Sequence, residues 1–378
     1  MNASLNIVVL GLSLSSSWGN GHATTYRSLL RGLHAQGHKV LFLERTRDWY
    51  AANCDLPDPD FCTLEYYDSL NDLGRFKGAI VNADVVLIGS YVPEGGDVID
   101  QVAALKPRVL CFYDIDTPVT MSRLDNYDEE YLRRRQIPLF DVYFSFSGGP
   151  VLGRLEDRYG ATRAAVLYCS VDPAKYYPIT SEIEWDLGYL GTYSPDRQPA
   201  LERLLIEPAR RLPECRFVVA GSQFPTDIDW PRNVERIEHL PSGQHADFYT
   251  RQRFTLNVTR ADMVAAGWSP SVRLFEAAAC ATPVITDRWN GLHELLPDGR
   301  ALLIADETGD VLDALTGLSE SSRRTIARNA RDRVLARHTG EARARELVSH
   351  VLPHLCAGPS VQPTIQKHLS RETVHESS

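Results

Sequence analysis

The sequence has no long apolar segment. Within its 378 residues, the apolar stretch at residues 5–14 is about half the length needed to span a bilayer, and no Lys or Arg precedes it. A buried strand accounts for this stretch better than a signal peptide does. We therefore expect a cytoplasmic protein without an integral membrane segment.

Paired cysteines are also missing. The seven cysteines are scattered, odd in number and never spaced Cys-x-x-Cys; they are Cys54, Cys62, Cys111, Cys169, Cys215, Cys280 and Cys356. This pattern favours reduced thiols in a cytosolic protein and provides no ligand spacing for a zinc site.

An excess of basic charge is absent as well. Lys and Arg total 40 against 49 Asp and Glu, a formal net charge of −9, which disfavours a nucleic-acid partner or an anionic membrane surface. An anionic ligand must then be bound by hydrogen-bond donors gathered at one site. At roughly 150 residues per domain, the length predicts two domains, and an apolar content of 43% is enough for two cores.

Short apolar runs alternate with amphipathic stretches along both halves of the chain. Continuous runs of this length are typical of parallel strands that helices cover on both faces. The pattern predicts an α/β protein with two Rossmann-like domains facing a central cleft. The runs lie at residues 5–10, 40–43, 85–88, 109–113, 142–146 and 166–168, and then at 187–190, 217–220, 234–237, 255–258, 283–286 and 302–305.

A polar, Pro-containing stretch near residue 180 separates the two halves. We place the N-terminal domain at residues 1–178 and the C-terminal domain at 179–340. A last helix at 341–356 is expected to pack back toward the N-terminal domain. Residues 357–378 hold few large apolar side chains and are predicted to be disordered.

A glycine-containing loop follows the first apolar run and leads into a helix. Its spacing is not Gly-x-Gly-x-x-Gly, so the dinucleotide fingerprint is not met, although Glu44 ends the second run, where a ribose-binding acid would lie. The loop either forms a tight turn or brings a ligand-binding group to the carboxyl edge of the sheet. We favour the second reading, as an acceptor-binding or phosphate loop that contains Trp18, Gly19, Asn20, Gly21 and His22.

Two acidic residues, Asp114 and Asp116, follow the apolar run at residues 109–113. Such a pair could hold a divalent metal, or one of them could cap the helix that begins near Pro118. We expect no metal here. Asp116 is the preferred contact for an acceptor hydroxyl, as a base or as a hydrogen-bond partner.

The segment from Gly267 to Asp287 is the most informative in the chain. Ser269 with Pro270 behind it predicts the start of a helix that runs to about Cys280, whose open amides would suit a diphosphate. Glu276 lies on this helix beside small residues, and a buried carboxylate there needs a partner. Two ribose hydroxyls would supply one, and a salt bridge with Arg273 is the alternative.

Taken in order, these motifs resemble the CgeB-like glycosyltransferases, which have the two-Rossmann B-type (GT-B) fold. The matching segments are Ser-Ser-Trp-Gly-Asn-Gly-His (16–22), Asp-x-Asp-Thr-Pro (114–118), Gly-Thr-Tyr-Ser-x-Asp-Arg (191–197), Ser-Pro-Ser-x-Arg-x-Phe-Glu (269–276) and Glu-Ala-Ala-Ala-Cys-Ala-Thr-Pro-Val-Ile (276–285). The resemblance covers residues 5 to about 350. Trp268 stands where related retaining enzymes have the first acid of a Glu-x7-Glu pair, and Ala281 replaces their usual glycine.

The resemblance implies an enzyme that moves a sugar from a nucleoside-diphosphate sugar to a small-molecule or glycan acceptor, with retention, and with neither metal nor cofactor. His22 and Asp116 would be the catalytic residues. The loop at 48–63 would select the acceptor. A nucleotide-sugar epimerase and a non-catalytic nucleotide-sugar binding protein are the alternatives. The implied donor-binding residues are Gly191, Tyr193, Arg197, Gly221, Ser269, Ser271, Arg273 and Glu276.

Overall fold

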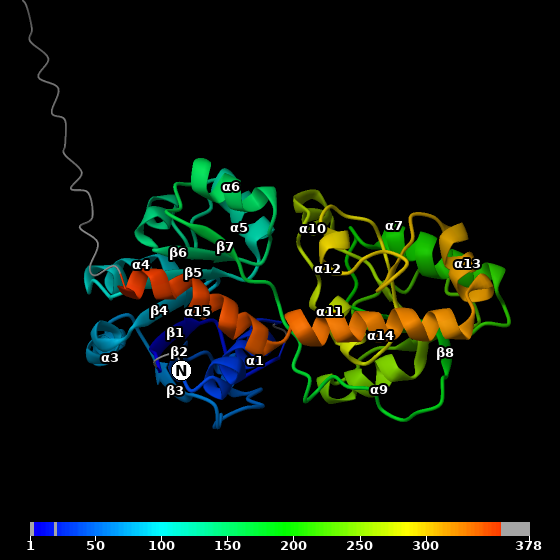
Figure 1. Cartoon of the computed structure of the whole chain (residues 1–378), viewed down its shortest axis with the longest axis horizontal. Coiled ribbons are helices and arrows are strands. Elements are labelled where there is room, and N and C mark those ends of the chain that lie inside the picture. Colours follow the sequence, from blue (N-terminus) through cyan, green and yellow to red (C-terminus); the bar gives the residue numbers. More distant parts are fainter. Residues whose placement is uncertain (1–3, 19–20, 357–378) are drawn as a thin grey trace, which may run out of the picture.

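The computed structural model describes residues 4–18 and 21–356, which form two α/β domains joined side by side (Figure 1). Each domain is built on one sheet whose paired strands all run parallel. The N-terminal sheet has seven strands in the order β3-β2-β1-β4-β5-β6-β7, and the C-terminal sheet has six in the order β10-β9-β8-β11-β12-β13. The predicted fold class is confirmed.

Twelve of the thirteen strands coincide with predicted apolar runs. They are β1 (Asn6–Gly11), β2 (Lys39–Arg45), β4 (Val85–Gly89), β5 (Leu110–Asp114), β6 (Val142–Ser145), β7 (Ala164–Val166), β8 (Trp185–Leu190), β9 (Phe217–Ala220), β10 (Val234–Ile237), β11 (Gln252–Asn257), β12 (Val284–Thr286) and β13 (Leu303–Ile304). The run at 166–168 was placed too late, because β7 ends at Val166. The strand β3 (Thr63–Tyr67) was missed because it lies at the sheet edge, where most of its side chains are exposed or half-buried.

Helices cover both faces of each sheet, as continuous apolar strands require. In β1, Ile7 and Val9 pack into one apolar cluster while Val8 and Leu10 pack into a second, on the opposite face. The helices of the N-terminal domain are α1 (Gly21–Ala35), α2 (Asp48–Ala51), α3 (Lys77–Asn82), α4 (Gly95–Ala104), α5 (Thr117–Asp125) and α6 (Pro150–Asp157). Those that follow in the chain are α7 (Gln198–Leu201), α8 (Glu207–Arg211), α9 (His245–Thr250), α10 (Ala261–Ala266), α11 (Val272–Ala279), α12 (Leu292–Leu295), α13 (Thr308–Gly317), α14 (Glu320–Arg337) and α15 (Gly340–Cys356). None of the helices described is both long and apolar enough to cross a membrane.

The chain crosses between the domains twice. It passes from the first sheet to the second through residues 167–184, and it returns where α14 ends and α15 begins (Figure 1). The two crossings touch, since Val171 and Thr339 form an isolated parallel bridge. Helix α15 then adds Leu347 and Val351 to the same apolar cluster as β1 and α1. The C-terminal helix is therefore part of the N-terminal core.

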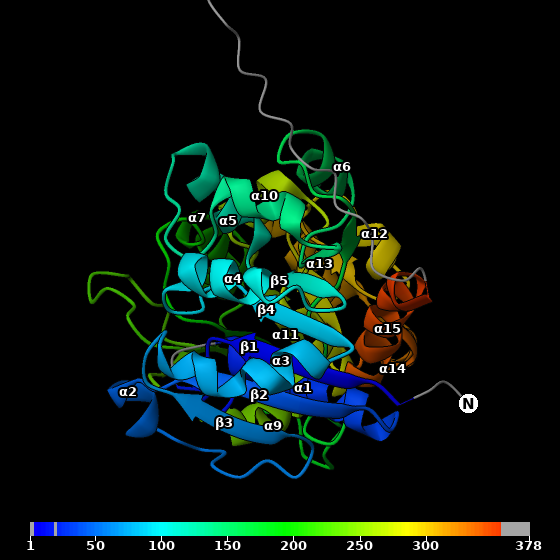
Figure 2. The same cartoon turned by 90° about the vertical axis from the view of Figure 1, so that its left-hand side faces the viewer.

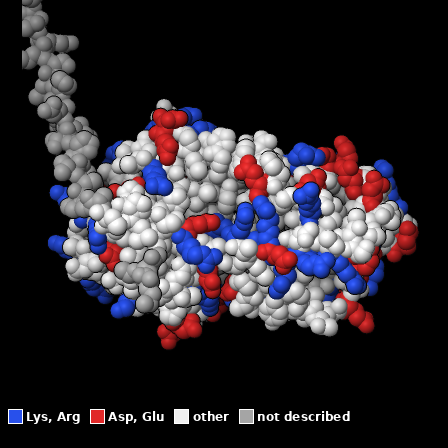
Figure 3. Space-filling view, viewed as in Figure 1, with Lys and Arg blue, Asp and Glu red and all other residues white. Residues whose placement is uncertain are grey.

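Helices α14 and α15 lie on one side of the molecule and α2 lies on the opposite side (Figure 2). On the face drawn in Figure 3, the acidic and basic side chains of the described residues are interspersed. Residues just after β5, β8 and β11 line one cavity, so carboxyl ends of strands from both sheets face the space between the domains, where open α/β sheets bind their ligands.

Replacing Gly340 by Ala should destabilise the fold. Gly340 begins α15 against α1, and a Cβ atom there would lie 1.9 Å from the carbonyl oxygen of Ser28. Because backbone cannot move aside cheaply, we expect a loss of about 3 kcal/mol in the free energy of unfolding, measured by urea denaturation. Gly309→Ala is the control: a Cβ there meets nothing within 4 Å, and the helical position in α13 predicts no loss. Equal effects of the two variants would contradict the packing argument.

Candidate functional site

Two connected cavities open between the facing sheet edges. The larger, called here the central cavity, measures about 480 Å³, and the smaller, the adjoining cavity, about 300 Å³. They share Gly21, Thr25, Thr192, Val272 and Arg273 in their walls. Both domains contribute to each cavity, so the site exists only in the two-domain assembly.

His22, on the first turn of α1, lines the central cavity. Burial lowers the pKa of His22 to about 4, so the imidazole is neutral near pH 7. Its Nδ1 atom has no hydrogen-bond partner among the described residues, and the ring meets Tyr91 edge-on with centroids 5.3 Å apart. A neutral imidazole with a free nitrogen can orient a ligand hydroxyl, but it is a weak base.

Asp114 and Asp116 have different surroundings although only two residues separate them. Asp114 is fully buried at the end of β5, where Thr120 Oγ1 and Tyr143 Oη donate hydrogen bonds of 2.7 Å to its carboxylate. Asp116 lines the central cavity and occupies the N-cap position of α5, but its side chain makes no cap hydrogen bond. Burial raises the pKa of Asp116, and Arg260 opposes that rise. Asp116 is thus the member of the pair that a ligand can reach.

Asp114 and Asp116 do not belong to a larger cluster of metal-binding side chains in the described part of the chain. Within residues 4–18 and 21–356, no group of three or more His, Cys, Asp or Glu side chains is arranged to hold a metal ion. The carboxylate of Asp114 is occupied by protein hydroxyls instead.

Three arginines, Arg197, Arg260 and Arg273, line the central cavity. None of them forms an ion pair with a residue that the structure describes. Arg197 is buried, its Nη2 donates to the carbonyl of Thr192 at 2.6 Å, and its Nε has no partner there. Burial lowers the pKa of Arg197, and the charges of Arg273 and Arg260 lower it further. The charge of Asp196 opposes this decrease, but no carboxylate among the described residues forms an ion pair with the three arginines, so their guanidinium groups are available to an anion.

Arg260 was missed by the sequence reasoning. It lies two residues beyond the end of β11 (Gln252–Asn257), immediately before α10, and is therefore at the carboxyl edge of the C-terminal sheet. The sequence could have indicated Arg260, because the loops after β1 and β5 are predicted to bind a ligand for the same reason: each follows the carboxyl end of a parallel strand.

The start of α11 differs from the prediction. Ser271, not Ser269, is the N-cap, and its hydroxyl accepts a hydrogen bond of 3.4 Å from the amide of Arg273. Ser269 is buried and its hydroxyl is hydrogen bonded to that of Ser147 in the N-terminal domain. The chain at Ser269 and Pro270 therefore docks the domains together, because Cys169 Sγ also donates to the carbonyl of Pro270 at 3.5 Å. Helix α11 therefore begins two residues later than expected.

Glu276 lines the adjoining cavity and is buried there. The hydroxyl of Tyr249 donates to Glu276 Oε2 at 3.3 Å. No cation among the described residues forms an ion pair with Glu276, so the alternative salt bridge with Arg273 is absent. A buried carboxylate with spare acceptor capacity facing a cavity is suited to a ligand that brings hydroxyl donors.

Two glycine turns shape the same cavity. Gly221 follows β9 with φ of +148°, and a Cβ atom there would lie 2.0 Å from the carbonyl oxygen of Gly191, which follows β8. Glycine at 221 lets the two strand ends approach each other. Tyr193 lies two residues after Gly191 and lines the central cavity. The centroid of its ring is 5.6 Å from that of Phe224.

The loop after β1 is only partly at the site. Gly21 lines both cavities. Trp18 is 58% exposed and lies outside both walls, whereas Gly19 and Asn20 fall outside the described residues. Glu44 does not reach a cavity, because its carboxylate accepts hydrogen bonds from the amides of Leu14 and Ser15 at 2.6 and 2.9 Å. It holds the loop in place, which removes the remaining reason to consider a ribose-binding acid there.

The segment at 48–63 contains a short helix, α2, and is joined to the loop after β1. Arg27 holds Asp55 through two hydrogen bonds of 2.9 and 2.6 Å, and Ser17 Oγ donates to the same carboxylate at 2.7 Å. No residue of this segment lines either cavity. Its predicted contact with the acceptor stays a prediction.

Trp268 lies between the two domains. Its ring lies against Gly149 of the N-terminal domain and Gly291 of the C-terminal domain, and a Cβ atom at either glycine would lie 2.4 Å from the ring. The amide of Gly148 also donates to the carbonyl of Trp268 at 3.0 Å. The residue thus contributes to domain contact and lines neither cavity.

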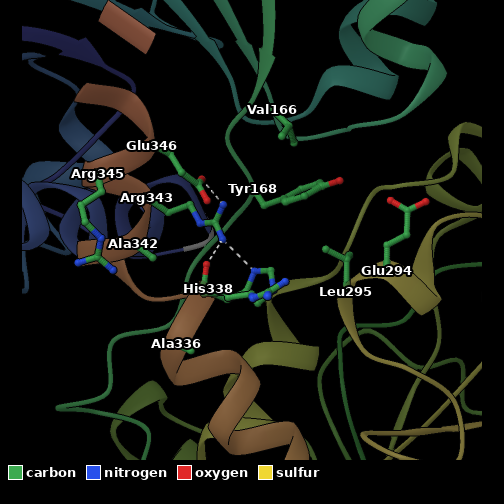
Figure 4. Close-up of a pocket in the computed structure, with 11 residues that line it drawn as sticks. Val166, Tyr168, Glu294, Leu295, Ala336, His338, Ala342, Arg343, Arg345 and Glu346 are labelled. Carbon is green, nitrogen blue, oxygen red and sulfur yellow. Dashed lines mark hydrogen bonds and ion pairs between the residues drawn. The ribbon is translucent and has the colours of Figure 1, made fainter. Parts of the chain in front are cut away.

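A third cavity, of about 310 Å³, lies where α14 meets α15. Figure 4 shows Arg343 there between Glu346 and His338, with Tyr168 and Glu294 on the other side. Arg343 is already paired with Glu346, in contrast to the arginines of the central cavity. We therefore regard this cavity as the weaker candidate.

Comparison with known proteins identifies the class of fold. Residues 197–349 match the protein family described as Glycosyl transferase-like, and no curated protein matches the sequence. Among solved structures, Anabaena HepE in complex with UDP-glucose has a TM-score of 0.66 at 13% identity, over 91% of this chain and 98% of its own. A sucrose-phosphate synthase from Thermosynechococcus elongatus has a TM-score of 0.64 at 15% identity, with the same coverage.

A third similar structure is an alpha-glucosyltransferase in complex with UDP-glucose and DNA containing an abasic site. It has a TM-score of 0.68 at 12% identity, over 92% of this chain and 100% of its own. At these identities the likeness defines architecture. The chain has the two-domain fold of the GT-B glycosyltransferases.

Removal of Arg273 should weaken anion binding at the central cavity. We expect Arg273→Ala to lower the affinity for inorganic diphosphate about tenfold to 100-fold, as measured by isothermal titration calorimetry, because a charge-assisted hydrogen bond is lost. Arg288→Ala is the matched control, since Arg288 is exposed and paired with Asp306. If both variants bind diphosphate as the parent does, the arginine wall is not an anion site.

Proposed function

We propose that the protein is a glycosyltransferase that moves a sugar from a nucleoside-diphosphate sugar to a hydroxyl-bearing acceptor. The observation that carries this proposal is the conjunction of three arginines without ion-pair partners and one buried, cation-free carboxylate, Glu276, in two connected cavities. A nucleoside diphosphate carries the matching groups, two phosphates and a ribose diol. The fold and the CgeB-like motifs agree with this assignment.

The donor would lie along the carboxyl edge of the C-terminal sheet. Glu276 would accept hydrogen bonds from the ribose hydroxyls, and the turns at Gly191 and Gly221 would let the nucleoside approach the backbone. The diphosphate would lie between Arg197, Arg260 and Arg273, near the N-terminus of α11. Helix amides and guanidinium groups are well suited to hold phosphate oxygens.

The chemical step needs negative charge to be stabilised on the leaving diphosphate. As the bond between the anomeric carbon and the phosphate oxygen breaks, the sugar gains oxocarbenium character and the phosphate gains charge. Preorganised arginines can stabilise this charge without a metal ion, and the loss of one such donor typically costs about 2.7 to 4 kcal/mol in the barrier. We therefore propose a metal-independent and cofactor-free transferase that works in the cytoplasm.

The acceptor, a small molecule or a glycan, would enter from the N-terminal side of the central cavity, beside His22 and Asp116. We propose retention of configuration, on the strength of the CgeB-like resemblance. The leaving phosphate then takes the acceptor proton on the same face, while Asp116 and His22 orient the acceptor hydroxyl. With inversion, Asp116 would be the base, because the pKa of His22 is low. The anomeric configuration of the product, read from NMR coupling constants, decides between the two.

Glu276→Ala should raise the KM for the donor about tenfold to 100-fold, because hydrogen bonds from the ribose hydroxyls to a charged acceptor are lost. The circular dichroism spectrum should not change. Glu341→Ala, an exposed glutamate on α15, is the control and should leave KM unaltered. An unchanged KM for Glu276→Ala would remove the ribose assignment.

A panel of ligands separates this proposal from the alternatives. UDP, GDP, TDP, ADP and NAD are compared by thermal shift, since a ligand that binds the folded state raises the melting temperature. We expect one nucleoside diphosphate to give the largest shift, and the corresponding sugar nucleotide to be consumed with release of that nucleoside diphosphate in the presence of excess chelator. A strict requirement for a divalent cation would revive the metal site at Asp114 and Asp116. Conversion of the donor without release of nucleoside diphosphate would indicate an epimerase.

A further inference from the structure

Two further arginines lie at the carboxyl end of β2, outside the walls of both cavities. Arg45 is the last residue of β2 and is paired in register with Tyr67, the last residue of β3. Arg47 comes two residues later and directly precedes α2, which lies at this end of the sheet (Figure 2). The loop after β5, with Asp116, leaves the same edge of the sheet. Both arginines are thus at the edge where open α/β sheets bind their ligands.

The two guanidinium groups have few partners within the protein. The side chain of Arg47 forms no hydrogen bond or ion pair with a described residue, and its guanidinium carbon lies 5.5 Å from the centre of the Trp49 ring. Arg45 forms one ion pair, of 2.9 Å, with Glu94. The Nε atoms of both arginines and Nη1 of Arg45 are buried and have no hydrogen-bond partner in the described part of the chain. Buried N–H groups without an acceptor cost free energy, which a ligand with acceptor oxygens would recover.

A buried tyrosine hydroxyl adds a third unused donor at the same place. The side chain of Tyr67 is 1% exposed, yet its hydroxyl has no hydrogen-bond partner among residues 4–18 and 21–356. The guanidinium carbon of Arg45 lies 5.7 Å from the centre of its ring. Burial raises the pKa of Tyr67, and the charges of Arg45 and Arg47 oppose this rise. Arg45, Arg47 and Tyr67 together are called here the basic patch.

The carboxylates near the basic patch do not neutralise it. Glu44 is buried, and its oxygens already accept hydrogen bonds from the loop after β1. Asp48 is exposed and forms no ion pair with a residue that the structure describes. Glu94 pairs with Arg45, but its side chain is 43% exposed. An ion pair with so exposed a carboxylate is weak, so an incoming oxyanion can displace Glu94.

The loop after β4 connects the basic patch to the central cavity. This loop contains Glu94, which pairs with Arg45, and Tyr91, whose hydroxyl donates to Asp116 Oδ2 at 3.4 Å. The ring of Tyr91 also meets that of His22 edge-on. In the sheet, β1 and β4 separate β2 from β5, and three strand spacings amount to about 14 Å. A ligand of about that length would reach from Asp116 to the two arginines.

We propose that the basic patch binds a phosphate or carboxylate group of the acceptor, so that the sugar is transferred to an anionic acceptor. This inference rests on the proposed function, in which the acceptor hydroxyl lies beside His22 and Asp116. The anionic group would lie on the order of 14 Å from the reacting hydroxyl. The half-exposed indole of Trp49, beside Arg47, is the place at which the segment at 48–63 would meet this acceptor.

Of the two oxyanions, phosphate matches the basic patch more fully. A phosphate monoester has three terminal oxygens and a charge near −2 at neutral pH. Two guanidinium groups and one phenol can each donate to one of these oxygens, and charge-assisted hydrogen bonds of this kind are strong. A carboxylate has one oxygen fewer and a single charge, so we expect it to bind more weakly.

The test measures the binding of inorganic phosphate by isothermal titration calorimetry, with a saturating nucleoside diphosphate present. The nucleoside diphosphate that gives the largest thermal shift is used, because it occupies the arginines of the central cavity and leaves the basic patch to phosphate. We expect Arg47→Ala and Arg45→Gln each to weaken phosphate binding about tenfold, since a charge-assisted hydrogen bond is lost. Arg47→Ala should fold normally, because this side chain has no hydrogen bond to lose within the described residues.

Two further variants make the test specific. Glu94→Gln removes the competing carboxylate and should tighten phosphate binding about threefold or more. Lys77→Ala is the matched control, because Lys77 is an exposed cation on α3 that forms no ion pair with a described residue; its loss should leave phosphate binding unaltered. Equal phosphate affinity in the parent, Arg47→Ala and Arg45→Gln would overturn the proposal. A tenfold loss in Lys77→Ala would overturn it as well, because net charge alone would then explain the effect.

Acetate in place of phosphate distinguishes the two oxyanions. Tighter binding of phosphate supports a phosphorylated acceptor, and tighter binding of acetate supports a carboxylated one, provided that either depends on Arg47. If no nucleoside diphosphate binds and no sugar nucleotide is consumed, the proposed function fails, and with it the assignment of the basic patch to an acceptor. If a sugar nucleotide is hydrolysed but phosphate and acetate bind equally to every variant, the function stands and the role of the basic patch fails.

Discussion

The close contact between α1 and the start of α15 is the constraint on which the site depends. Ser28 and Gly340 approach so closely that no side chain fits between them, and Ser170 of the other crossing bonds to Ser28 through its hydroxyl at 2.9 Å. Both interdomain crossings are therefore fastened to one helix. Because α1 also carries His22 and Gly21 at its opposite end, the same helix fixes the position of the domains and forms one wall of the cavities.

Charge is distributed to suit one anionic ligand and not a polyanion. The chain has a net charge of −9, yet Arg197, Arg260 and Arg273 gather at one cavity without ion-pair partners among the described residues. Elsewhere the arginines are mostly paired, as Arg343 is with Glu346. Charges that repel one another in a partly buried site cost free energy in the unliganded protein. The proposed binding of a diphosphate would offset that cost, which is why the cluster indicates a ligand site more strongly than an ion-pair network would.

Sequence reasoning succeeded where a local rule fixes the outcome. Buried parallel strands appear as continuous apolar runs, so twelve strands could be placed from the sequence, whereas β3 lies at an exposed edge and has no such run. The burial of Glu276 could be predicted, because small residues surround this carboxylate on its helix. The start of α11 could not, because Ser269 is diverted by Ser147, a contact between residues 122 positions apart. Arg260 was missed although its place after a strand was a usable signal, and only the folded chain shows that it lies beside Arg197 and Arg273.

The Asp-x-Asp pair shows how one short motif can divide two roles between its residues. At the end of a strand, successive side chains alternate in direction, but Asp116 has already left β5 and begun the turn into α5. Asp114 therefore points into the core, toward Thr120 and Tyr143, while Asp116 faces the cavity. Two carboxylates this close in sequence would repel each other if both faced the same ligand without a metal. Because Asp114 is buried among protein hydroxyls and Asp116 faces the cavity, that conflict is reduced.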